Sequence, residues 1–242
     1  MNIVIIGHGK MGKAINSRAQ KSGIVVSKII NNYAELINYN FHSQEVAIDF
    51  TEPLGFLQNI KTLALKGVNT VCGTTGWFGS INQVQELVAK ANIGFIYSPN
   101  FSIGVNIFLR IIQAASSIMN QFKSYEVIGN EVHHKSKKDI PSGTLLTAAQ
   151  IIINNIKRKN KIVTNNIDKI KEDSLYLHSS RSGTEIGIHE IVFDSINDYI
   201  KISHHAKSRD AYAYGAIRCA KWIKNKKGFY SIENFMHEII NV

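Results

Sequence analysis

The glycine-rich stretch GHGKMG at residues 7–12 constrains the fold of this chain more than any other feature. Gly7, Gly9 and Gly12 have the G-x-G-x-x-G spacing and directly follow the β-branched run NIVII at residues 2–6. Between a strand and a helix, the first glycine allows a tight turn, the second lets a pyrophosphate approach the backbone, and the third lets the helix pack closely on the strand. Free N–H groups at the helix start would attract the phosphates. The pattern predicts a dinucleotide site, with a plain tight turn as the alternative.

Strands and helices alternate along the first part of the chain. Short apolar runs predict strands at residues 2–6, 25–30, 45–50, 69–73 and 93–98. Helical periodicity predicts helices from Met11 to Lys21, from Leu54 to Lys66 and from Ser80 to Ala91. This alternation is typical of a parallel sheet with helices on both faces, so we expect an α/β, doubly wound fold here.

The pattern changes from about Ser102 onwards. We expect helices at residues 105–119, 143–156 and 211–224, the last of the chain, and strands at 125–132, 187–193 and 198–206. The last two strands alternate polar and apolar residues, as strands with one exposed face do. A second, smaller α+β domain with an open mixed sheet follows, and a homo-oligomer would cover that sheet.

Composition excludes several classes of protein. The formal net charge is +10, but the lysines are scattered and no aromatic residues interleave with them, so we expect no nucleic-acid partner. An anionic small molecule explains the basic charge equally well. The chain has no apolar run of membrane-spanning length and no secretory leader, and Cys72 and Cys219 lie far apart without a CxxC pattern. We therefore expect a cytoplasmic protein with no membrane segment and no metal site.

Two further segments lie where a dinucleotide crevice is expected. DFTEP at 49–53 and CGTTGW at 72–77 each follow a predicted strand, and their small and hydroxyl residues would let ribose and nicotinamide approach. Ordinary strand-to-helix turns with threonine caps are the alternative. The acidic residue that usually follows the second strand is replaced by asparagines 31 and 32, while lysines 10, 13 and 28 are near. This favours NADPH, or use of both NADPH and NADH.

The segment EVHHKSKKDIPSGTLL, residues 131–146, concentrates titratable groups before a predicted helix start. A histidine such as His133 can transfer a proton near neutral pH, and Lys137 supplies positive charge or a proton. Ser142 is a good N-cap, after which the N–H groups of Gly143 and Thr144 lie at a helix N-terminus, where they would hold a carboxylate. The segment can thus bind and protonate an anionic substrate. A solvated polar loop with an incidental cap is the alternative.

These motifs together resemble the dihydrodipicolinate reductase (4-hydroxy-tetrahydrodipicolinate reductase) family, and the resemblance runs nearly end to end. It rests on GHGKMG, DFTEP, CGTTGW, SPNFSIGVN at 98–106, EVHHKSKKDIPSGT, SRSGTEIGIHE at 180–190 and AKSRDAYAYGAIRCAKWI from 206. The histidine-to-PSGT segment and SPNFSIGVN are the most specific of these.

The resemblance implies a role for each matching residue. His133 would be the proton donor or acceptor and Lys137 a second proton donor, while His134, Ser142, Gly143 and Thr144 would bind a small dicarboxylate substrate. The implied cofactor contacts are Gly7, His8, Gly9, Lys10, Met11, Gly12, Gly73, Thr74, Thr75, Ser98, Pro99, Asn100 and Phe101.

The resemblance also implies an architecture and an activity. A Rossmann-type domain would comprise residues 1–101 and 212–242, and a substrate and oligomerisation domain residues 102–211, in a homotetramer. The reaction would be NADPH- or NADH-dependent reduction of 4-hydroxy-tetrahydrodipicolinate, or dihydrodipicolinate, in the diaminopimelate route to lysine. Two hypotheses compete with it: a dinucleotide-binding sensor without turnover, and a different Rossmann reductase of small acids. The chain departs from many relatives in its short glycine turn and its asparagines after the second strand, and residues 157–176 match no motif.

Overall fold

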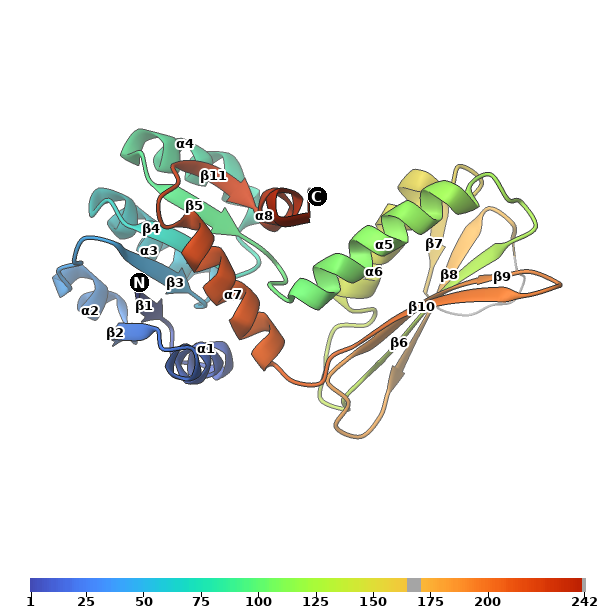
Figure 1. Ribbon diagram of the computed structural model, residues 1–242, viewed down its shortest axis with the longest axis horizontal. Coiled ribbons are helices and arrows are strands. Elements are labelled where there is room, and N and C mark those ends of the chain that lie inside the picture. Colours follow the sequence, from blue (N-terminus) through green and yellow to red (C-terminus); the bar gives the residue numbers. More distant parts are fainter. Residues whose placement is uncertain (165–170, 241–242) are drawn as a thin grey trace. The chain divides into compact units, whose positions relative to one another are not determined.

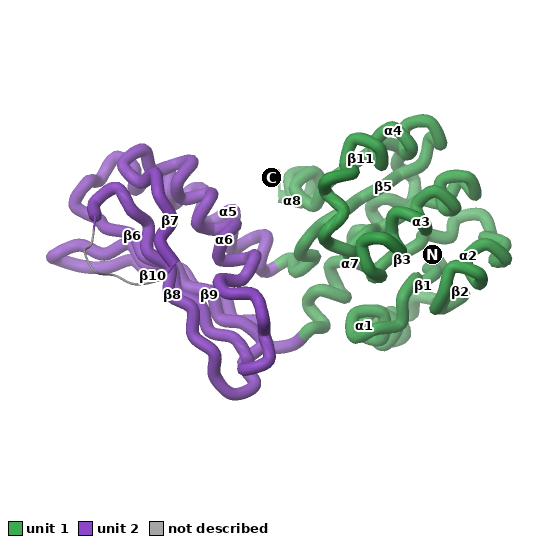
Figure 2. The backbone as a smooth tube through the Cα atoms, turned by 180° about the vertical axis from the view of Figure 1, so that it is seen from behind, with its two compact units in different colours: residues 1–103, 209–242 green, residues 104–208 purple. Residues whose placement is uncertain are grey.

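The computed structural model describes residues 1–164 and 171–240, and the chain divides into two compact units. One unit comprises residues 1–103 and 209–242, and the other residues 104–208 (Figure 2). The family resemblance implies domain boundaries close to these, at 101/102 and 211/212.

A parallel sheet forms the centre of the first unit (Figure 1). Its strands are β1 (Asn2–Ile6), β2 (Val25–Ile30), β3 (Glu45–Asp49), β4 (Asn69–Cys72), β5 (Gly94–Tyr97) and β11 (Gly228–Ser231), in the order β11-β5-β4-β3-β1-β2. Every residue of β3 and β4 is buried, as expected for strands covered on both faces. The five strands predicted from apolar runs are confirmed.

Helices cover both faces of this sheet (Figure 1). Alternate residues of β1 point to opposite faces, so Ile3 and Ile5 pack with one set of helices and Val4 and Ile6 with the other. The first set is α1 (Lys10–Lys21), α7 (Asp210–Ile223) and α8 (Ile232–Ile240). The second set is α2 (Tyr33–Asn38), α3 (Pro53–Leu65) and α4 (Ile81–Ala91), which follows a short 3-10 turn at Phe78–Ser80. The doubly wound α/β prediction is correct.

The second unit is a mixed sheet with two helices on one face (Figure 1). Its strands are β6 (Glu126–His133), β7 (Lys161–Val163), β8 (Ser174–Arg181), β9 (Ile188–Asp194) and β10 (Tyr199–His205), in the order β10-β9-β6-β8-β7. Strand β6 is parallel to β8 and antiparallel to β9. The helices are α5 (Ile103–Met119) and α6 (Gly143–Asn155), and they share one apolar core with the sheet. The expected α+β unit with a mixed sheet is thereby confirmed.

Several elements were not predicted. Strands β7 and β8 flank the lysine- and asparagine-rich stretch that the sequence leaves unassigned, of which residues 165–170 lie outside the described residues. The expectation that the helix at 211–224 is the last of the chain is wrong, because β11 and α8 follow it. Helix α2 has only six residues. Its N-cap is Asn32, whose side chain accepts a hydrogen bond from the N–H of Glu35. A helix as short as α2 shows too little periodicity to be predicted from the sequence.

Helix α7 packs against the chain after β5 at a glycine. A Cβ added at Gly215 would overlap the carbonyl oxygen of Phe101. By contrast, a Cβ at Gly55, near the start of α3, would make only ordinary contact with the Thr51 side chain, at 3.7 Å. Helix α7 therefore needs glycine at 215 for packing, whereas α3 does not need it at 55.

We predict opposite effects for alanine at these two helical glycines. Gly215→Ala should destabilise the protein by about 1–3 kcal/mol because the backbone must shift to relieve the overlap. Gly55→Ala should stabilise it by about 0.5–1 kcal/mol because it favours the helix at no steric cost. Urea unfolding midpoints measure both. A Gly215→Ala protein as stable as the wild type would contradict this packing.

Candidate active site

The glycine turn between β1 and α1 has the geometry of a phosphate cradle. Gly7 has φ +89°, and a Cβ at Gly12 would overlap the Gly7 carbonyl oxygen, so neither position accepts a side chain readily. A Cβ at Gly9 would meet no atom within 4 Å. Gly9 is the N-cap of α1, and that helix has neither a side-chain cap nor an acidic residue in its first turn. Its N-terminal N–H groups are therefore left for an anion, and the turn fits a dinucleotide pyrophosphate.

The two segments after β3 and β4 are fastened to each other by a buried carboxylate. Asp49 is fully buried and accepts hydrogen bonds from the hydroxyls of Thr51 at 2.6 Å and Thr74 at 3.1 Å. It also accepts one from the Asn59 amide at 2.9 Å. The Thr74 hydroxyl is thus engaged in the turn, and Thr75 beside it is exposed. A cofactor would meet the backbone and Thr75 here.

The stretch after β5 is folded on itself. Ser98 is buried, and its Oγ donates to the carbonyl of Asn100 at 2.8 Å and accepts from the Asn100 N–H at 3.0 Å. Phe101 is buried in the core and Pro99 is exposed. Because β1, β3, β4 and β5 are parallel and adjacent, the segments that follow them meet at one edge of the sheet. The structure therefore brings together the residues expected to contact the cofactor.

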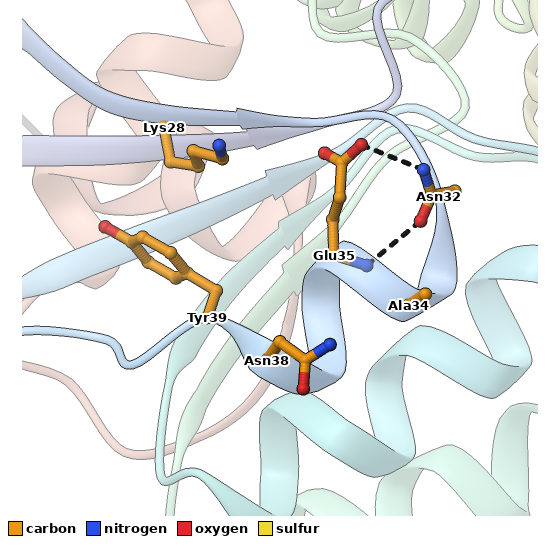
Figure 3. A pocket seen from close by; sticks show the side chains of 6 residues that line it. All are labelled: Lys28, Asn32, Ala34, Glu35, Asn38 and Tyr39. Carbon is orange, nitrogen blue, oxygen red and sulfur yellow. Dashed lines mark hydrogen bonds between the residues drawn. The ribbon is translucent and has the colours of Figure 1, made fainter.

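A surface pocket beside the carboxyl end of β2 contains an acidic residue that no sequence motif indicates (Figure 3). It is lined by Lys28, Asn32, Ala34, Glu35, Asn38 and Tyr39. The Glu35 carboxylate accepts from the N–H of Asn31 at 3.0 Å and from the Asn32 amide at 2.8 Å. Ile30, which precedes Asn31 and is the last residue of β2, accepts a hydrogen bond through its carbonyl from the N–H of Gly7 at 2.9 Å. A carboxylate from α2 therefore lies at the strand end where the sequence offers only asparagines.

The histidine and lysine segment links the end of β6 to the start of α6. His133 is the last residue of β6, and a turn follows in which the N–H of Lys137 donates to the carbonyl of His134 at 3.1 Å. The Lys137 ammonium donates to both oxygens of Asp139 at 2.8 Å. His134 pairs through Nδ1 with the Ser136 hydroxyl at 2.9 Å. The two adjacent histidines thus have different neighbours.

The start of α6 is capped as the sequence predicts. Ser142 Oγ accepts a hydrogen bond from the Leu145 N–H at 3.3 Å. No acidic residue lies in the first turn, and Gly143 is exposed, with no atom within 4 Å of the position that a Cβ would take. This thirteen-residue helix therefore presents its positive end with open space beside Gly143.

A buried carboxylate, Glu131, lies at the centre of this site, and it is not among the site residues that the sequence predicts. Both of its oxygens accept from the N–H of Ser142, at 3.0 and 3.1 Å. The guanidinium of Arg181, at the end of β8, approaches one of these oxygens at 3.3 Å. The Glu131 side chain is fully buried. It therefore joins two strands to the helix start.

Two imidazoles border this carboxylate. His133 Nδ1 lies 3.6 Å from Glu131 Oε2, and the rings of His133 and His189 are 4.9 Å apart. His189 Nε2 is 3.1 Å from the Ser142 hydroxyl. Burial lowers the pKa of His133, against the opposing charge of Glu131, and burial lowers the pKa of His189 to about 4. His189 is therefore neutral near pH 7.

The same three side chains have the composition of a metal site. Donor atoms of Glu131, His133 and His189 lie within 4.8 Å of one another. The carboxylate is already occupied by the Ser142 N–H and faces the Arg181 guanidinium, whose positive charge disfavours a cation there. Burial by itself would raise the pKa of Glu131, but the hydrogen bonds from Ser142 and the nearby charge of His133 hold this pKa below its ordinary value. We therefore interpret these three side chains as a cluster held by hydrogen bonds and charge, and not as a metal site.

Known proteins resemble the chain over nearly its whole length. Two family models match it, dihydrodipicolinate reductase N-terminus at residues 1–101 and dihydrodipicolinate reductase C-terminus at residues 104–236. A 4-hydroxy-tetrahydrodipicolinate reductase from Christiangramia forsetii is 33% identical over 239 residues, covering 99% of both chains. One from Archaeoglobus fulgidus is 36% identical over 200 residues, covering 79% of this chain and 76% of the relative.

Solved structures show the same fold. A dipicolinate-bound dihydrodipicolinate reductase from Paenisporosarcina sp. TG-14 superposes with a TM-score of 0.71 at 22% identity, covering 97% of this chain and 98% of that one. A probable dehydrogenase from Thermotoga maritima gives a TM-score of 0.56 at 10% identity, covering 93% and 88%. Among the described residues, no helix combines the length and hydropathy that a membrane span needs.

Proposed function

This chain belongs to the dihydrodipicolinate reductase family, and we propose that it reduces 4-hydroxy-tetrahydrodipicolinate, or its dehydrated form, to tetrahydrodipicolinate in the diaminopimelate route to lysine. The observation that carries the proposal is the helix start at Ser142, which is bonded to Glu131 beside the His133 imidazole. A carboxylate site and a proton-transferring group are what the reduction of an anionic imine requires.

The substrate carboxylate would bind at the start of α6. The N–H groups of Gly143 and Thr144 belong to the first turn, where the helix dipole favours negative charge. Ser142 cannot offer its own N–H, because Glu131 holds it, so Ser142 serves as the cap. Lys137 adds positive charge from the neighbouring turn. The family resemblance also implies His134 as a substrate contact, and in this structure its Nδ1 is hydrogen-bonded to the Ser136 hydroxyl.

The reduced nicotinamide, when bound, supplies the hydride. The residues of the first unit that fit the dinucleotide are the glycine turn from Gly7 to Gly12, Gly73 with Thr75, and the stretch from Ser98 to Phe101. Their contribution is binding and orientation. Hydride addition leaves negative charge on the conjugated imine, and His133 or Lys137 would supply the proton that neutralises it.

The second unit would also carry self-association. Strand β10 is an edge strand whose Tyr199 and Ile200 side chains are 64% and 44% exposed. Pairing with other copies would cover this edge, in a homotetramer. Residues 1–101 and 212–242 would then bind the cofactor, and residues 102–211 the substrate. Two buried cysteines that remain free thiols, Cys72 and Cys219, suit a reducing cytoplasm.

A kinetic assay tests the proposed function. The purified protein should oxidise NADH or NADPH when the cyclic dicarboxylate imine is supplied. His133→Gln should lower turnover by about two to four orders of magnitude, the range usual for a general acid or base. Its affinity for the dinucleotide should stay unchanged, because His133 lies in the other unit. A wild-type protein that binds the dinucleotide and never oxidises it would instead support a sensor.

We further expect a preference for NADH because of Glu35. A carboxylate at the end of β2 accepts hydrogen bonds from ribose hydroxyls and repels a 2′-phosphate, in contrast to the NADPH preference that the nearby lysines favour. NADH should bind about tenfold more tightly than NADPH. Fluorescence titration of both cofactors measures the ratio.

Glu35→Gln is the matched variant for this test. It keeps an acceptor for the Asn31 N–H and removes the negative charge. The ratio of the NADPH to the NADH dissociation constant should therefore fall towards one. A wild-type protein that binds NADPH as tightly as NADH would contradict the role of Glu35.

A further inference from the structure

We propose that Glu131 is a positioning residue for proton transfer, because one carboxylate both anchors the start of α6 and sets the orientation and proton affinity of His133. The inference rests on the proposed function for its catalytic meaning. Glu131 and His133 lie two residues apart on β6 and so share a face of the sheet. Neither Lys137 nor the cap at Ser142 explains why a charge is buried here.

The burial of Glu131 is costly unless its partners compensate it. Its side chain is fully buried, and its two oxygens accept the Ser142 N–H. Arg181 adds a guanidinium at 3.3 Å and, through a second nitrogen, donates to the carbonyl of Asp139 at 2.6 Å. The ionised carboxylate is therefore held in place from β8 and from α6, with little freedom to move.

His133 faces this fixed charge. Within residues 1–164 and 171–240, His133 Nδ1 is buried without a hydrogen-bond partner, and Glu131 Oε2 is 3.6 Å from it. The negative charge of Glu131 at this distance favours the imidazolium, whereas burial favours the neutral ring. The opposite ring edge is confined by Gly187, where a Cβ would lie 2.9 Å from His133 Nε2.

Other charged groups around His133 act in both directions. Lys137 and Arg181 disfavour its protonated form, and Asp139 favours it. His189, packed against the ring at 4.9 Å, is neutral near pH 7. Glu131 is the largest of the groups that favour the charged imidazole. Removing its charge should therefore make His133 a weaker base.

The test compares two carboxylates of the same strand. Glu131→Gln removes the charge beside His133, and Glu126→Gln removes a charge at the other end of β6, where Glu126 pairs with Lys159. We expect Glu131→Gln to lower kcat about ten- to a hundredfold and to move the high-pH limb of the rate profile to lower pH. Glu126→Gln should leave kcat and the profile unchanged, although it also removes a carboxylate of β6 from an ion pair. Cofactor affinity should stay constant in both.

Arg181→Gln gives a second, opposite readout. It removes a positive charge from the surroundings of His133, so the same limb should move to higher pH. Structural damage alone would not shift the two variants in opposite directions. If Glu131→Gln does not fold, the position of the high-pH limb of the rate profile in the folded Arg181→Gln variant tests the proposal. If the high-pH limb of the rate profile stays where it is in the wild type in every folded variant, the proposal is overturned.

A spectroscopic titration separates this proposal from the proposed function. The His133 imidazole can be titrated by NMR without substrate, in the wild type and in both variants. Opposite shifts of the His133 pKa in a protein that does not turn over the imine would reject the activity and keep the positioning role. Full activity with an unshifted His133 would reject the positioning role alone.

Discussion

The second unit, residues 104–208, depends on the contact between the Glu131 carboxylate and the N–H of Ser142. A buried charge is tolerated here because a backbone N–H and the Arg181 guanidinium bind it together. The contact fixes where α6 begins relative to β6, and thereby where the N–H groups of Gly143 and Thr144 lie. It also places a negative charge next to His133. The proposed carboxylate site and the proposed proton-transferring group therefore share one anchor.

The first unit, residues 1–103 and 209–242, relies on close backbone packing at glycines. Gly12 packs against Gly7 so tightly that α1 begins directly at the turn, and Gly215 lets α7 approach Phe101. Asp49 then ties the segments after β3 and β4 through the threonine hydroxyls. Hydroxyl groups that look available in the sequence are thus partly used to hold the loops. What remains for a cofactor is backbone and a few exposed side chains such as Thr75.

The sequence predicts the parts of this protein whose signal is local. The glycine turn, the apolar strands and the Ser142 cap are each written in a few adjacent residues, and the structure has all three. The carboxylate at Glu131 could have been noticed, because its spacing from His133 puts both on one face of a strand. Its partner Arg181 could not, because it lies 50 residues further along on a strand that no pattern indicated. Glu35 was missed because its helix is too short to show periodicity.

The most direct test of the central claim is amide NMR of the labelled protein titrated with pyridine-2,6-dicarboxylate. If a carboxylate binds at the start of α6, the Gly143 and Thr144 N–H resonances should shift downfield and saturate together with binding. The Ser142 N–H should move little, because Glu131 already holds it. Saturable binding that leaves the resonances of residues 143 and 144 in place would contradict the account.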